Sequence, residues 1–91
     1  MPFPCVNHRK VNKMLKDLEP KPRKRARKAL KRISENVIVP RNKKLKGELK
    51  GYWSYKMGQY RIVYKKHSDL IDVLCMGHRK EVYEIAKRRL S

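Results

Sequence analysis

The sequence has few cysteines, few acidic residues and no long apolar run. Its two cysteines, Cys5 and Cys75, are far apart and have neither CxxC nor Cys/His metal spacing, which argues against a disulfide framework and a zinc site. No apolar run is long enough to span a membrane, and the N-terminal residues MPFPCVNHRK lack the apolar core of a signal peptide. We therefore expect a cytoplasmic protein in a reducing compartment, with no membrane partner.

The few acidic residues exclude further classes of protein. The 91 residues include 8 Asp plus Glu, and Asp69, Asp72, Glu81 and Glu84 do not form a convincing metal-ligand set. We therefore expect no metal and no cofactor. Against these acids stand 26 Lys plus Arg, which give a formal net charge of +18 at pH 7. This charge is far greater than solubility requires and favours a polyanionic partner, above all a nucleic acid.

The centre of the chain has the pattern of a β-hairpin. Gly58 and Gln59 lie between two runs rich in Tyr, Ile, Val and Trp, as in a two-residue hairpin turn with Gly at its first central position. In this register Lys56 faces Arg61, and residues opposite one another share a side of the sheet. One side is then apolar and aromatic, and is expected to pack on helices. Its residues are Trp53, Tyr55, Met57, Tyr60, Ile62 and Tyr64.

The other side of the predicted hairpin is cationic. Its residues are Tyr52, Ser54, Lys56, Arg61, Val63 and Lys65. Directly opposed Lys56 and Arg61 have Cβ atoms roughly 5 Å apart in such a pair, and like charges at this spacing destabilise a hairpin unless an anion lies between them. A phosphate group suits this position.

Helical and extended patterns flank the hairpin within a single domain, residues 1–91. Apolar residues at i, i+3, i+4 and i+7 predict a helix from His8 to near Glu19. Pro20 and Pro22 break that helix, and a second runs to about Asn36. Residues 3–7 resemble a short edge strand, 37–51 a connector, 70–76 a covered strand and 80–90 a helix. The expected fold class is α+β: an N-terminal helical hairpin packed on a small twisted antiparallel β-sheet, with a C-terminal helix.

The second helix is strongly basic, with Lys or Arg at eight of the twelve positions from 21 to 32. Few acids compensate these charges, so phosphate groups relieve their repulsion best. An ordinary solvated face is the alternative. We predict that side chains of this helix, the connector and the hairpin bind nucleic acid. They are Arg23, Lys24, Arg25, Arg27, Lys28, Lys31, Lys43, Lys44, Lys46, Ser54 and Lys65.

Two motifs follow each other in the second half of the chain: YKMGQYRIVY, with Gly58-Gln59-Tyr60-Arg61 at its centre, and GHRKEVY, with His78-Arg79 followed by Tyr83. In this order they resemble the RelE/ParE superfamily of toxin–antitoxin toxins, and within it the RelE-type messenger-RNA interferases. The likeness covers roughly residues 7–90. It implies a RelE-like fold, a cognate antitoxin in a hetero-oligomer, and the ribosome and mRNA as further partners, so that the nucleic-acid-binding residues above bind RNA and the ribosome.

The resemblance also implies a reaction. RelE-like toxins cut mRNA in the ribosomal A site without a metal, by attack of a ribose 2′-hydroxyl on the adjacent phosphate. This chemistry requires a base, cations for the phosphorane and an acid for the 5′-oxygen. By position, Lys56 resembles the base-side cation, Arg61 the phosphate clamp, Arg79 the acid-side residue and Tyr83 the ring that stacks on or orients the substrate. His78 is a further candidate for proton transfer.

One departure and several alternatives accompany this interpretation. Where several family members have a second basic residue, two positions before Lys56, this chain has Ser54. Tyr83 is also consistent with packing, and His78 with the end of a strand. Two other functions stay open: a ParE-like inhibitor of DNA gyrase, and a catalytically inactive relative that binds RNA or ribosomes.

Overall fold

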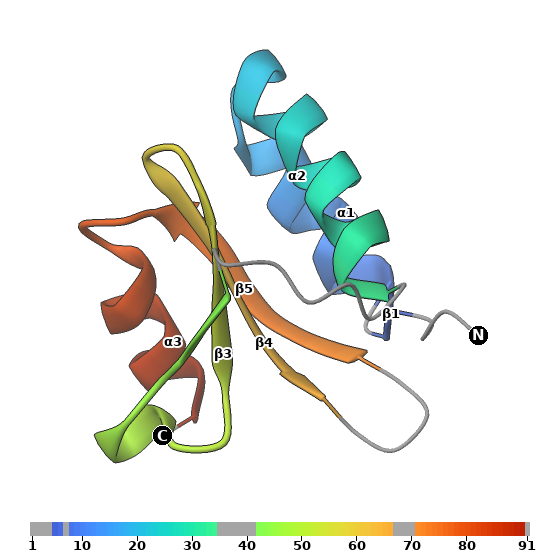
Figure 1. The fold of residues 1–91 in the computed structure, drawn as a ribbon. Coiled ribbons are helices and arrows are strands. Elements are labelled where there is room, and N and C mark those ends of the chain that lie inside the picture. Colours follow the sequence, from blue (N-terminus) through green and yellow to red (C-terminus); the bar gives the residue numbers. More distant parts are fainter. Residues whose placement is uncertain (1–4, 7, 35–41, 67–70, 91) are drawn as a thin grey trace.

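A computed structural model describes residues 5–6, 8–34, 42–66 and 71–90 (Figure 1). In chain order the elements are β1 (Cys5–Val6), α1 (His8–Asp17), α2 (Pro20–Ser34), β2 (Asn42–Lys44), the short 3-10 helix η1 (Gly47–Leu49), β3 (Trp53–Met57), β4 (Tyr60–Lys66), β5 (Ile71–His78) and α3 (Val82–Leu90). The strands form one sheet in the order β1-β5-β4-β3-β2. Strands β2 to β5 pair antiparallel, whereas β1 pairs parallel with β5. The α+β class expected from the sequence is confirmed.

The register of the β3–β4 hairpin is the predicted one. Lys56 pairs with Arg61 and Trp53 with Tyr64, so Gly58 and Gln59 form the turn. Gly58 has a φ of 62°, a conformation that the first central position of this turn type requires and that glycine adopts most easily. The turn therefore fixes which side chains share each face of the sheet.

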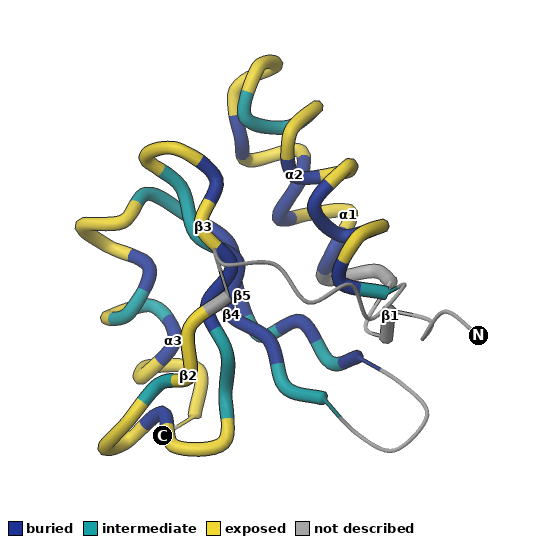
Figure 2. Tube along the Cα trace, viewed as in Figure 1, coloured by how far each residue is buried: buried dark blue, intermediate teal, exposed yellow. Residues whose placement is uncertain are grey.

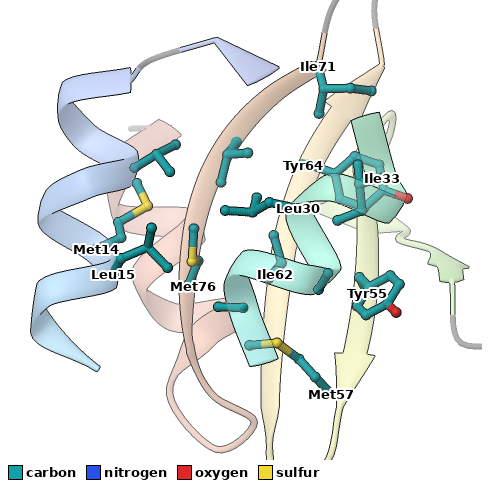
Figure 3. Close-up of a cluster of buried hydrophobic side chains, with 14 of the residues drawn as sticks. Met14, Leu15, Leu30, Ile33, Tyr55, Met57, Ile62, Tyr64, Ile71 and Met76 are labelled. Atoms are coloured by element: carbon teal, nitrogen blue, oxygen red, sulfur yellow. The ribbon is translucent and has the colours of Figure 1, made fainter. Parts of the chain in front are cut away.

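The helical hairpin α1–α2 covers the aromatic face of the sheet, as predicted (Figure 3). The buried residues of the two helices recur at helical spacing, and the opposite side of α2 is exposed (Figure 2). They are Val11, Met14, Leu15, Leu18, Ala26, Ala29, Leu30 and Ile33. On the sheet they meet Tyr55, Met57, Ile62, Tyr64, Ile71, Val73 and Met76. This cluster is the main hydrophobic core.

Helix α3 packs on the opposite face, where the sequence predicted a cationic surface (Figure 1). Val82 and Ala86 of α3 form a second buried cluster with Val63, Cys75 and Leu49. A bulge between Val63 and Tyr64 shifts the β4–β5 register. The middle of this face is therefore apolar and covered, whereas Lys56 at its hairpin end is exposed.

The structure also differs from expectation at the edges of the sheet. The predicted connector contains β2 and η1, and Leu49 of η1 is buried in the second cluster. The first edge strand pairs parallel rather than antiparallel. Parts of the predicted first strand, second helix, connector and third strand lie outside the described residues. No described helix has both the length and the apolar composition to cross a membrane.

Candidate functional site

Lys56 and Arg61 lie opposite each other next to the hairpin turn, on the face that α3 covers farther along. Lys56 is exposed and Arg61 half-buried. The Nη1 group of Arg61 donates to the carbonyl oxygens of Gly58 at 2.9 Å and Tyr60 at 3.0 Å. These bonds hold the guanidinium at the turn. Because a guanidinium has five N–H donors, its Nε and Nη2 groups, which have no acceptor among the described residues, are left for an anion.

Tyr83 extends this site from α3. Its hydroxyl lies 3.1 Å from Oγ of Ser54, which shares a side of β3 with Lys56 because side chains alternate along a strand. Ser54 is only 2% exposed. The sequence predicts that Ser54 contacts RNA, but its burial under α3 removes it from the surface, and its hydroxyl contacts that of Tyr83 instead.

β5 ends at His78, and Arg79 comes directly after it. The backbone N–H of Arg79 donates to the carbonyl of Gln59 at 2.7 Å, which anchors this exposed arginine beside the turn. His78 pairs with Tyr60, and the two rings make an edge-to-face contact with centroids 5.6 Å apart. Since Tyr60 is on the α1–α2 face, His78 lies on the other side of the sheet from Lys56 and Arg61.

Helix α2 brings a second set of cations to the hairpin. Arg25, Lys28 and Arg32 line a groove of about 660 Å³ together with Lys56, over Tyr55 and Met57. The approach is close, because a Cβ built on Gly58 lies 2.8 Å from Nη1 of Arg25. Arg32 is not among the residues predicted from the sequence to bind nucleic acid, although its i+4 spacing from Lys28 places the two side chains on one face of a helix.

The other predicted RNA-binding residues have different surroundings. Arg23 is tied to the end of α1, where its guanidinium donates to the carbonyls of Leu15 at 2.9 Å, Lys16 at 3.2 Å and Leu18 at 2.9 Å. It therefore joins the two helices, and this use departs from the predicted RNA contact. Lys24, Arg27, Lys31, Lys43 and Lys46 are exposed.

Two further predicted lysines lie over aromatic rings at the end of the hairpin away from the turn. Nζ of Lys44 is 5.3 Å from the ring centroid of Trp53, and Nζ of Lys65 is 5.6 Å from that of Tyr52. Both distances are in the range of cation–π contacts. These two lysines therefore have aromatic partners within the sheet.

Two buried groups outside this site have raised pKa values. Burial raises the pKa of the Tyr64 hydroxyl to about 12 and that of the Cys75 thiol to about 11. Both groups are therefore neutral near pH 7. Within the described ranges, no group of three or more His, Cys, Asp or Glu is arranged to hold a metal ion.

Known proteins have sequences and folds similar to those of this chain. The family model that matches is that of the ParE toxin of type II toxin–antitoxin systems, over residues 8–83. A chain of the RelBE2 toxin–antitoxin complex from Mycobacterium tuberculosis has a similar structure, with a TM-score of 0.69 and 23% sequence identity; the match covers 87% of this chain and 100% of that chain.

A chain of the YoeB-YefM complex from Staphylococcus aureus is also similar, with a TM-score of 0.62 and 20% identity; the match covers 87% of this chain and 97% of that chain. No curated protein sequence matches significantly. The two solved structures share the fold, and the family model spans most of the sequence. This chain is therefore a type II toxin–antitoxin toxin of the RelE/ParE superfamily.

Proposed function

We propose that this toxin is a ribosome-dependent, metal-independent endoribonuclease that cleaves mRNA in the ribosomal A site and so inhibits translation. The observation that carries the proposal is the direct opposition of Lys56 and Arg61 beside the hairpin turn, on the same face as the Tyr83 hydroxyl. A phosphodiester between the two cations relieves their repulsion and receives charge-assisted hydrogen bonds.

The proposed reaction is attack of a ribose 2′-hydroxyl on the adjacent phosphorus. The 2′-oxygen loses its proton and forms the new P–O bond, the bond to the 5′-oxygen breaks, and that oxygen gains a proton. The products are a 2′,3′-cyclic phosphate and a 5′-hydroxyl. Charge on the phosphorane is greatest in the transition state, so fixed cations accelerate this step.

Each residue has a distinct part in this proposal. The free donors of Arg61 suit two phosphate oxygens at once. Lys56 is on the base side, Arg79 is on the acid side, where its charge stabilises the leaving oxygen, and Tyr83 orients the substrate. His78 lies on the opposite face of the sheet from this group, so proton transfer at the 2′-hydroxyl falls to Lys56 or Tyr83.

The proposed partners follow from the charge of the surface and from the similar structures. Exposed cations on α2 and β2 provide non-specific contacts with ribosomal RNA, and the groove beside Lys56 continues the positive surface to the turn. Both similar structures are toxin–antitoxin complexes. We therefore propose a cognate antitoxin whose acidic or amphipathic segment covers the cationic surface of this cytoplasmic toxin.

Primer extension on a message translated in a reconstituted system tests the proposal. Wild-type toxin should cut only when ribosomes are present, and Arg61→Ala and Arg79→Ala should each lower the cleavage rate by roughly 100-fold, the usual effect of losing one transition-state donor. Lys13→Ala removes the same charge from an exposed position on α1 and should cleave normally. Ribosome-independent cutting, or full activity in both arginine variants, contradicts the proposal.

A second candidate function is inhibition of DNA gyrase, favoured by the match to the ParE family. That activity works through protein–protein contact and does not require Lys56 and Arg61 as catalytic residues. Two results together support gyrase inhibition. The double variant Arg61→Ala/Arg79→Ala still arrests growth, and purified toxin inhibits DNA supercoiling by gyrase. An inactive RNA binder instead shows salt-dependent ribosome binding without cleaved product.

A further inference from the structure

Ser54 is a buried polar side chain in the face of the sheet that α3 covers. It is 2% exposed, and its Oγ is 3.1 Å from the Tyr83 hydroxyl. Tyr83 is half-buried, and its ring packs against the cluster formed by Val63, Cys75 and Val82. The two hydroxyls therefore meet at the border between the apolar cluster and the surface that carries Lys56.

The difference in burial indicates which hydroxyl donates. If Tyr83 donates, the Ser54 hydrogen is left inside the protein, because Tyr83 is the only partner that the described residues give Ser54. A buried donor without an acceptor is costly. If Ser54 donates, its hydrogen is satisfied and the Tyr83 hydrogen points toward the open side of the phenol. The second arrangement leaves no buried donor unpaired.

We propose that Ser54 is a positioning residue for the RNA-cleaving site: it donates to the Tyr83 oxygen, fixes the phenol beside Lys56, and leaves the phenol O–H free to donate to a phosphate oxygen of the RNA. This inference rests on the proposed ribonuclease function. In this proposal the buried serine orients a hydroxyl on α3. Tyr83 donates a hydrogen bond to the substrate, and its ring packs against the cluster.

The test uses four variants in single-turnover cleavage of ribosome-bound mRNA, each added at a series of known concentrations. Ser54→Ala should lower the maximal rate by about 10-fold, the size expected for one hydrogen bond, without changing the toxin concentration at half-maximal rate. Ser54→Thr keeps the hydroxyl and should restore most of the rate. Tyr83→Phe should lose at least as much as Ser54→Ala, and Ser54→Ala/Tyr83→Phe should be no slower than Tyr83→Phe alone.

Other outcomes overturn the inference. A wild-type rate in Ser54→Ala, an equal loss in Ser54→Thr, or independent losses in the double variant each remove the positioning role. A lower melting temperature for Ser54→Ala at an unchanged rate shows that the bond only stabilises α3. If wild-type toxin cleaves and Arg61→Ala does not, a normal Ser54→Ala defeats this inference alone. If wild-type toxin does not cleave at all, the proposed function fails with it.

Discussion

The two faces of this sheet are built from the same strands but are covered very differently. Two helices cover one face from β3 to β5, and the cluster beneath them includes large side chains such as Tyr64, Ile62 and Met76. On the other face the single helix α3 covers a smaller cluster and leaves the hairpin end exposed. One face therefore provides most of the stability, and the other combines modest stability with the candidate site.

Neighbouring residues of β4 give the largest contrast between the faces. Ile62→Ala removes a fully buried side chain from the main core and should lower the free energy of unfolding by about 2–5 kcal/mol, as measured by urea denaturation. Arg61→Ala, one residue away on the other face, removes two side-chain hydrogen bonds to backbone carbonyls and should lower that free energy by only about 1 kcal/mol while abolishing most cleavage. If Arg61→Ala is as destabilising as Ile62→Ala, the proposed difference between a stabilising face and a functional face is wrong.

Alkaline pH should lower the free energy of unfolding in two separate pH ranges, one for each face of the sheet. Burial raises the pKa of Cys75, on the α3 face, from 9.0 to about 11, with Arg89 partly opposing, and that of Tyr64, on the helical-hairpin face, from 10.0 to about 12. The folded state holds both protons more tightly than the unfolded state. Stability is therefore full below about pH 9 and falls as pH rises, by at most about 3 kcal/mol for each group.

Substitutions separate these windows. Cys75→Ala should flatten the fall between pH 9 and 11, and Tyr64→Phe the fall between pH 10 and 12, in denaturation curves measured across the range. No described residue bonds the Tyr64 hydroxyl, so Tyr64→Phe should cost little at pH 7. An unchanged alkaline profile in Cys75→Ala indicates that the thiol is not protected by α3.

The smallest expected effect concerns how firmly α3 is held. Nη1 of Arg89 donates to the carbonyl of Leu74 at 2.7 Å, next to the β-bulge. Arg89→Ala should lower the free energy of unfolding by about 1 kcal/mol and speed reaction of the Cys75 thiol with a thiol reagent. Lys87→Ala, an exposed residue of the same helix, is the matched control. Equal behaviour of the two variants indicates that the Arg89 bond contributes nothing.

The sequence predicted elements whose signals are local. Alternation on either side of Gly58-Gln59 was enough for the register that opposes Lys56 to Arg61, and apolar spacing with Pro20 and Pro22 was enough for the helical hairpin. β2 was missed because Asn42-Lys43-Lys44 has neither alternation nor strand-forming residues. Such a strand exists only because β3 offers an edge to pair with.

Parts of the candidate site depend on tertiary contacts that no local pattern encodes. Ser54 and Val63 alternate with Lys56 and Arg61 as if on an open face, and nothing in the strand shows that α3 covers two of the four. The side of His78 also depends on the β4–β5 register. Likewise, Arg23 and Arg25 are close in sequence, but Arg23 bonds the end of α1 whereas Arg25 lies beside the hairpin turn.

The parallel pairing of β1 with β5 has a consequence for the order of assembly. Cys5 lies opposite Ile71, so this contact closes a far longer loop than the two-residue turn of β3–β4, and the entropy lost in closing a loop grows with its length. We expect the hairpin to form early and the β1 edge last. Pulse-labelled hydrogen exchange during refolding should protect the β3–β4 amides before those of β1, which makes the cationic turn one of the first native features of the newly folded chain.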